Sequence, residues 1–192
     1  MPSRKVRQNP EFIAQAVMET PLGLIFLVFS THGLKRLIFA EEKEFREGVV
    51  LGATPETQSL APGILKDWHD RVAQALDDYF AGKPADFASL PLDLIGSPFQ
   101  LRLWHELRLI PFGRTVSYRE LALRLGDPRA SRAVGQACRA NPLPIIIPCH
   151  RVIGADGSLG GYSSWLLRKR WLLWHEGVSL TRKSRTRGPR LP

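Results

Sequence analysis

The chain has 192 residues, of which 44% are hydrophobic, and this length allows one large or two small globular domains. No apolar run reaches the ~20 residues that cross a bilayer, which argues against a membrane protein. The two cysteines form no Cys-x-x-Cys spacing. This pattern argues against a disulfide scaffold or a zinc knuckle and favours a reduced intracellular compartment, with no metal or other cofactor.

The net charge of +9 is unevenly distributed. Residues 11–98 contain seven Lys or Arg and thirteen Asp or Glu, whereas residues 99–170 contain twelve Lys or Arg and four Asp or Glu. Eleven of those twelve cations are arginine, whose planar guanidinium donates two hydrogen bonds to a phosphate at once. The asymmetry indicates an acidic and a basic domain. The alternative is a basic surface with no specific partner, and the basic ends of the chain alone support only that.

In the N-terminal half, the pattern predicts a small sheet followed by a helix. Residues 22–40 read as two apolar strands around a turn at residues 30–33. Residues 64–81 place apolar side chains along one helical face, and the Gly- and Pro-containing stretch that follows is the predicted linker. We therefore expect an N-terminal α/β domain at residues 1–90, a second domain at residues 91–180 and a basic tail at residues 181–192.

The second half contains strong helix-start signals. Capping boxes begin at Ser97 and Ser117, each with Gln or Glu three residues later. The helix after Ser117 is expected to stop at Gly126, and Asp127-Pro128 is expected to open the next helix. Two helices joined by so short a turn predict a helix-turn-helix.

The second helix of that motif has two faces. One face carries the spacing of a buried stripe, formed by Ala130, Ala133, Val134, Ala137 and Cys138. The other carries Arg129, Arg132, Gln136 and Arg139, and on the second helix of such a motif this face is predicted to contact DNA. Cys138 is therefore interpreted as a structural cysteine.

A last helix is predicted over residues 164–176, closed by Gly177. It carries the apolar residues Leu166, Leu167, Trp171 and Trp174. Its three consecutive cations, Arg168, Lys169 and Arg170, are interpreted as a solvated patch.

Residues 145–152 read Ile-Ile-Ile-Pro-Cys-His-Arg-Val. The β-branched run predicts a buried strand, which would hold Cys149 and His150 at its end. A thiol attacks as the thiolate, so a neighbouring proton acceptor decides its reactivity. Taken alone, a free cysteine is more often a small buried core residue. The surrounding segments favour the reactive interpretation.

Those segments are Arg-Ala-Val-Gly at residues 132–135, Pro-Cys-His-Arg at 148–151, Gly-Gly-Tyr-Ser at 160–163 and His-Glu-Gly at 175–177. Together they resemble the O6-alkylguanine-DNA alkyltransferases, the methylated-DNA–protein-cysteine methyltransferases. The resemblance extends over residues 97–177, and the N-terminal half is similar in length and pattern only. It implies an α+β fold of two domains. The first is a small β-sheet with a helix, and the second is mainly helical and winged-helix-like, with the helix-turn-helix.

The resemblance also implies roles for single residues. Cys149, a water, His150 and Glu176 would form a relay that activates the thiol. Tyr118 would donate toward the guanine ring and contact the DNA, and Asn141 would tie the active-site turn to the helix-turn-helix. The substrate pocket would be formed by Pro144, Val152, Tyr162, Ser163 and Ser164. Ser164 stands where many relatives have glycine, and it is expected to affect how large an alkyl group fits.

The function implied is irreversible, single-turnover repair of double-stranded DNA. A methyl or larger alkyl group would pass from O6-alkylguanine to Cys149, with O4-alkylthymine as an open alternative substrate. The target base must leave the stack, and Arg132 would fill the vacated space from the minor groove. A monomer is expected, in the cytoplasm at the nucleoid of a prokaryote or in the nucleus of a eukaryote.

Two other functions stay open at this point. One is an alkylated-DNA sensor that binds lesions without transfer, but relatives of that type lack the reactive cysteine. The other is a cysteine-dependent hydrolase, which would leave the arginine-lined helix unexplained.

Overall fold

The computed structural model describes residues 14–40, 62–160 and 166–179. The chain forms two compact units, residues 1–94 and residues 95–192. The first contains a three-stranded sheet and a helix, and the second is mainly helical. The predicted α+β fold of two domains is therefore confirmed.

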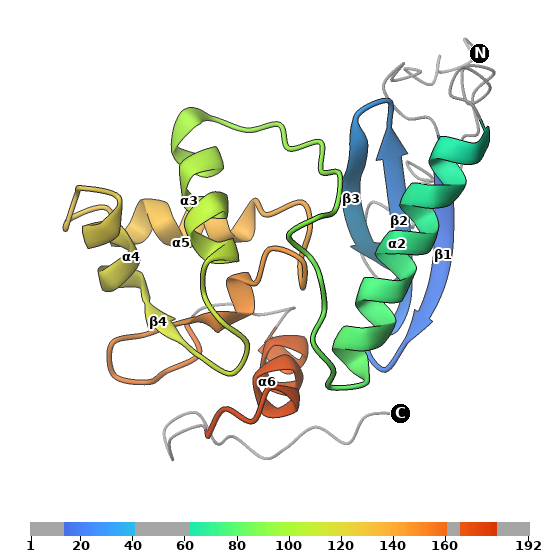
Figure 1. Ribbon diagram of the computed structural model, residues 1–192. Helices are drawn as coiled ribbons and strands as arrows, with labels where there is room; N and C mark the ends of the chain where they lie inside the picture. The colour runs from blue at the N-terminus through green and yellow to red at the C-terminus, as the bar shows by residue number, and fades with distance from the viewer. Residues whose placement is uncertain (1–13, 41–61, 161–165, 180–192) are drawn as a thin grey trace, which may run out of the picture. The chain divides into compact units, whose positions relative to one another are not determined.

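The first unit is an antiparallel sheet with the strand order β1-β2-β3, formed by β1 (Ala14–Thr20), β2 (Gly23–Ser30) and β3 (Gly33–Phe39). Helix α2 (Pro62–Phe80) runs along the sheet (Figure 1). The hairpin of β2 and β3 was predicted from their apolar runs. Strand β1 was not predicted, because its sequence Ala-Gln-Ala-Val-Met-Glu-Thr shows neither a long apolar run nor strict alternation. On α2, Val72, Leu76 and Tyr79 are buried, as their spacing predicts.

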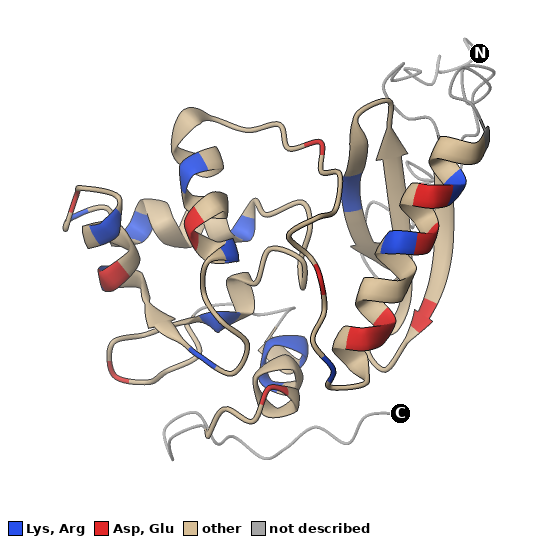
Figure 2. Cartoon of the chain, in the orientation of Figure 1, with Lys and Arg blue, Asp and Glu red and all other residues tan. Residues whose placement is uncertain are grey.

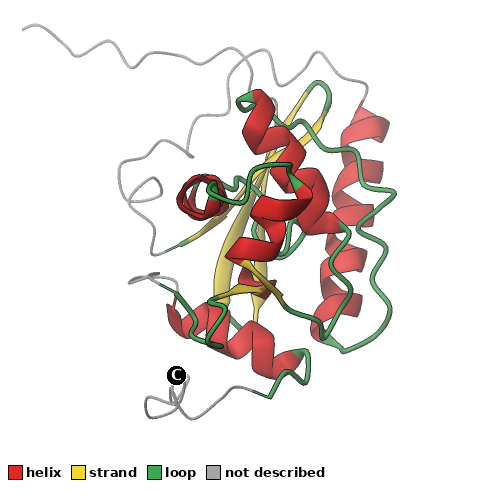
Figure 3. Cartoon of the chain, turned by 90° about the vertical axis from the view of Figure 1, so that its left-hand side faces the viewer, coloured by secondary structure: helices red, strands yellow, loops and turns green. Residues whose placement is uncertain are grey.

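The second unit contains four α-helices among its described residues: α3 (Pro98–Arg108), α4 (Tyr118–Arg124), α5 (Ser131–Arg139) and α6 (Leu166–His175) (Figure 3). Both predicted capping boxes are present, at Ser97 with Gln100 and at Ser117 with Glu120. Helices α4 and α5 pack against each other as the predicted helix-turn-helix. Trp104 on α3 donates from Nε1 to the carbonyl of Ala137 at 3.0 Å, which ties α5 to α3.

A short parallel pair of strands was not predicted. Strand β4 (Val116–Ser117) pairs with β5 (Val152–Ile153), with Val116 opposite Val152. Helix α4 follows β4 directly, and the 3₁₀ helix η2 (Cys149–Arg151) precedes β5 directly. In this parallel pair the start of α4 and the end of η2 therefore lie at opposite ends, separated by two-residue strands. Two-residue strands carry too little pattern to be recognised in a sequence.

The strand predicted at residues 145–147 is wrong. These three isoleucines lie in turns, with Ile145 at a φ of 75° and the Ile147 amide donating to the Leu143 carbonyl at 2.8 Å. Prolines at positions 142, 144 and 148 remove amide donors that a strand ladder needs. The run is apolar because it is buried, with each isoleucine at most 2% exposed.

The start of α5 was also predicted too early. The Asp127 side chain accepts from the Arg129 amide at 2.9 Å, and its carbonyl accepts from the Ala130 amide at 3.0 Å. Asp127 therefore stabilises a turn, and the helix begins at Ser131. Within α5 the predicted faces hold: Val134, Ala137 and Cys138 are buried.

The buried face of the last helix includes a lysine. The buried residues of α6 are Lys169, Leu172 and Leu173, whereas Leu167 is 56% and Trp174 70% exposed. The interpretation of Lys169 as part of a solvated patch is therefore wrong, since its exposure is 3%. Hydrophobic spacing did not predict this buried face, because one of its residues is a lysine. The predicted beginning of this helix, at residues 164–165, lies outside the described residues.

Within residues 14–40, 62–160 and 166–179, no helix is long and apolar enough to cross a membrane.

Candidate active site

Cys149, His150 and Arg151 are consecutive residues of η2, and all three are buried. The turn before them is held by Asn141, which follows α5. Its Nδ2 donates to the Ile147 carbonyl at 2.7 Å, and its Oδ1 accepts from the Leu143 amide at 3.0 Å. Asn141 thus connects the end of the helix-turn-helix to the segment that presents the thiol.

His150 and Glu176 form a close pair. The distance from His150 Nε2 to Glu176 Oε1 is 2.7 Å, and the two side chains are 4% and 0% exposed. An ionised carboxylate only accepts hydrogen bonds, so the proton lies on Nε2 and Nδ1 is left as the acceptor. Among the described residues, the buried Nδ1 has no hydrogen-bond partner. The imidazole is therefore oriented with its basic nitrogen available.

Glu176 accepts from two further groups, which reasoning from the sequence missed. Arg151 donates to it from Nε at 2.9 Å and from Nη2 at 3.0 Å, and the Gly113 amide donates at 3.0 Å. Burial alone would raise the pKa of Glu176, but the hydrogen bonds and charges of His150 and Arg151 outweigh burial and hold this pKa well below its ordinary value. Glu176 is thus ionised and fixed from three sides.

The buried guanidinium of Arg151 also donates from Nη1 to the Ile110 carbonyl at 2.6 Å. Nothing in the sequence indicated this role, because arginine is seldom buried unless it is paired. In the Pro-Cys-His-Arg motif, Arg151 is thus the residue that fixes the Glu176 carboxylate.

Burial sets the protonation of the other two groups. It raises the pKa of Cys149, against a hydrogen bond from Asn141 and the charge of Lys169, which lower it. It lowers the pKa of His150, against the hydrogen bond and charge of Glu176, which raise it. The resting site therefore holds a thiol beside a neutral imidazole, which can take a proton.

Cys138 is buried as well, and burial raises its pKa. Burial alone thus does not distinguish the two cysteines. Cys138 lies on α5, whereas Cys149 adjoins the histidine that is paired with Glu176. Among the two cysteines, Cys149 is thus the one that lies next to a group able to accept its proton.

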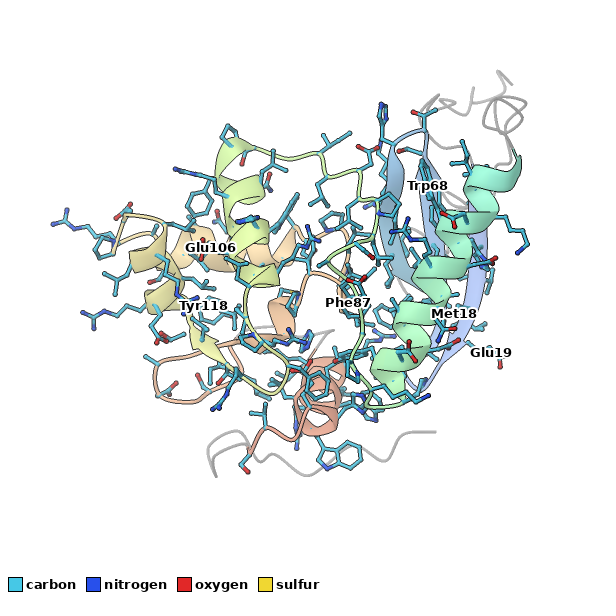
Figure 4. The ribbon with its side chains drawn as sticks, viewed as in Figure 1. Met18, Glu19, Trp68, Phe87, Glu106 and Tyr118 are labelled. Atoms are coloured by element: carbon cyan, nitrogen blue, oxygen red, sulfur yellow. The ribbon has the colours of Figure 1, made fainter. Side chains whose placement is uncertain are left out.

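Tyr118 is the first residue of α4, beside β4 (Figure 4). Burial raises the pKa of its hydroxyl to about 12, with the thiols of Cys138 and Cys149 raising it further. Gly160 lies against the ring, and a Cβ at that position would be 2.9 Å from the Tyr118 hydroxyl. Tyr118 therefore shares the environment of the thiol.

Of the five residues predicted to form the substrate pocket, Pro144 and Val152 are buried around η2. The Val152 carbonyl accepts from Lys169 Nζ. Tyr162, Ser163 and Ser164 lie outside the described residues.

Four of the residues predicted to contact DNA are exposed. Arg132, Gln136 and Arg139 are exposed on α5, and Arg129 is exposed in the turn before it. Lys and Arg are spread over the helices of the second unit (Figure 2). The helix that buries Cys138 thus presents cations on its outer face.

Comparison with known proteins agrees with this arrangement. Residues 13–94 match a family model described as 6-O-methylguanine DNA methyltransferase, ribonuclease-like domain, and residues 98–178 match its DNA binding domain. A Salmonella typhimurium methylated-DNA–protein-cysteine methyltransferase is 41% identical over 84% of this chain and 94% of its own. A Thermus thermophilus DNA base-flipping protein is 44% identical over 84% and 98%.

A solved structure of Mycobacterium tuberculosis OGT in complex with DNA has a TM-score of 0.67 and 39% identity, and covers 83% of this chain and 90% of its own. With both halves matched in order, the chain belongs to the 6-O-methylguanine DNA methyltransferase family.

Proposed function

We propose that the protein repairs DNA by moving an alkyl group from O6-alkylguanine in double-stranded DNA to Cys149. The observation that carries this proposal is the buried cysteine beside a histidine whose Nε2 lies 2.7 Å from Glu176. The similarity to methylated-DNA–protein-cysteine methyltransferases supports it. The protein would act as a monomer, at the DNA of the cytoplasm or nucleus.

The residues present account for each proton in the reaction. Glu176 keeps the proton of His150 on Nε2, so Nδ1 takes the thiol proton of Cys149 through a water. The thiolate attacks the alkyl carbon, forming an S–C bond as the C–O bond to guanine breaks. The departing guanine receives a proton from Tyr118. The proton that His150 took from the thiol then returns to the Tyr118 phenolate, so both residues end in their starting protonation states. The thioether is a poor leaving group, so each molecule reacts once.

DNA would bind to the exposed face of α5. The O6 atom is out of reach in a stacked duplex, so the nucleotide must be flipped. Arg132 would fill the vacated space, and Arg129, Gln136 and Arg139 would contact the backbone. Binding through the minor groove reads sequence weakly, which suits lesions that arise beside any base. In this scheme residues 1–90 form a separate domain of unassigned role.

A lesion-binding protein without transfer is the second candidate, since a relative of similar identity is named a DNA base-flipping protein. Cys149 and its relay distinguish the two functions. The protein is mixed with duplex DNA that contains O6-methylguanine, and its peptides are mapped by mass spectrometry. One methyl group on Cys149, and none in Cys149→Ser, supports transfer. Binding with no adduct would establish the sensor.

The flipping step has a test of its own. Arg132→Ala is compared with Arg129→Ala on methylated duplex and on the free base O6-methylguanine, which needs no flipping. The expected result is that Arg132→Ala slows repair of the duplex far more than alkylation by the free base. Arg129→Ala should mainly change the salt dependence of binding, by about 0.9 in the log–log slope for a lost phosphate contact. Equal losses on both substrates in Arg132→Ala would contradict the assignment.

A further inference from the structure

Lys169 lies in the interior of the second unit, where a charged side chain is unusual. It is 3% exposed, and the buried stripe of α6 that contains it packs against η2, the element that carries Cys149. Its ammonium donates to the carbonyl of Val152, three residues after the cysteine, and lies 5.8 Å from the centre of the Tyr118 ring. Isolated buried ammonium groups are strongly disfavoured, so its position calls for a specific use.

Lys169 interacts with groups of three neighbouring elements. Its ammonium lies over the ring of Tyr118 at the start of α4, and its charge acts on Cys149 and His150 of η2 and on Cys138 of α5. Burial lowers the pKa of Lys169 to about 8, while the charges of Cys149 and Cys138 raise it. At neutral pH the side chain therefore remains mostly protonated and presents a positive charge to the thiols.

We propose that Lys169 is the positioning residue that stabilises the Cys149 thiolate, as a fixed positive charge that also holds the Val152 carbonyl beside η2. When the thiol proton passes through water to His150, Lys169 keeps all three of its protons and its charge offsets the new negative charge on sulfur. The inference rests on the proposed function only in taking Cys149 as the reactive group.

Two effects of the charge act in the same direction. An opposite charge nearby lowers the pKa of an acid by about 1–3, which counters the burial of the thiol. The same charge opposes protonation of His150, so the imidazole stays available as the base. The His150–Glu176 pair removes the thiol proton of Cys149, and the charge of Lys169 stabilises the resulting thiolate in its buried site.

The experiment titrates Cys149 without DNA or alkylguanine. Iodoacetamide alkylates a thiolate, with iodide as the leaving group, and peptide mapping separates Cys149 from Cys138. The rate at Cys149 is measured against pH in the wild type, Lys169→Met, Lys169→Arg and Arg170→Met. Methionine fills a similar volume without charge, whereas the arginine variant keeps the charge on a larger head group. Arg170 is the neighbouring cation outside the buried stripe and serves as the matched control.

The expected result is a rise of at least about 1 in the pKa of Cys149 in Lys169→Met, which is a tenfold loss of thiolate below that pKa. Lys169→Arg should recover part of the loss, and Arg170→Met should match the wild type. Thermal unfolding is measured for each variant to confirm that it is folded, because Lys169→Met also removes the donor to the buried Val152 carbonyl. An unchanged pKa of Cys149 in folded Lys169→Met would overturn the proposal. Because no DNA is used, failure of alkyl transfer itself leaves this result intact.

Discussion

Replacing Glu176 by glutamine tests how the site is assembled. The side chain is 0% exposed and pairs with Arg151, itself 8% exposed. The substitution removes the negative charge but leaves the guanidinium buried. Breaking a buried ion pair on one side costs about 3–5 kcal/mol, so Glu176→Gln should lower the free energy of unfolding by roughly that amount at pH 7.

The double variant separates charge from shape. In Arg151→Met with Glu176→Gln, no charge is left buried at this pair, and replacing both partners is often neutral or better. Urea denaturation should therefore show most of the loss recovered. As a control, the exposed pair of Lys66 and Asp70 on α2 should tolerate Asp70→Asn with little change. A Glu176→Gln variant as stable as the wild type would refute the reasoning.

The pH dependence of stability provides a second test of the ion pair between Glu176 and Arg151. The folded pKa of Glu176 lies below its ordinary value of 4.5, so the unfolded chain binds more protons in acid. The stability contributed by Glu176 is present above pH 4.5 and is lost as the pH falls through the folded pKa. The difference between the wild type and Glu176→Gln should thus shrink below pH 4.5. A difference that stays constant down to pH 3 would contradict the ion pair as its cause.

Three further outcomes are expected. Gly160→Ala should slow alkyl transfer more than Gly126→Ala, since both glycines have positive φ but only Gly160 adjoins the Tyr118 hydroxyl; equal transfer rates would argue against this contact. Asn141→Ala should cost about 1–3 kcal/mol in urea denaturation, because two buried backbone groups lose their partner; a loss within error would remove Asn141 as the support of the turn. Between pH 8 and 10.5 the wild type should gain stability relative to Lys169→Met. The reason is that the folded pKa of Lys169 is depressed, so the unfolded chain binds more protons in this range. A loss of stability relative to Lys169→Met over the same range would contradict a depressed pKa.

The sequence was informative where a local rule acts alone. Both capping boxes lie where Ser97 and Ser117 predict them, because a cap depends on residues three apart. The amphipathic spacing of α5 also predicted the correct faces, since its buried side is built from apolar residues and its outer side from arginine and glutamine.

The failures have a common physical cause, which is that burial and conformation are different properties. Residues 145–147 are as apolar as a strand, yet Asn141 and the surrounding prolines fold them into turns. On α6, the buried stripe contains Lys169, and hydrophobic spacing alone assigns a lysine to the surface. A charge is tolerated in the core only where distant residues face it, and a sequence does not reveal those partners.

Lys169 on helix α6 and Glu176, the residue that follows this helix, place two opposite charges near the short 3₁₀ helix η2. Lys169 and Glu176 are seven residues apart, two turns along the same face, and both are buried. Glu176 orients the imidazole of His150, while Lys169 acts on the thiol, so each end of the face addresses one partner of the proton transfer. Such buried charges usually cost stability relative to apolar residues. Substitutions on this face should therefore act on different quantities. In folded Lys169→Met the main loss should be in thiol reactivity, whereas Glu176→Gln should lower both stability and thiol reactivity.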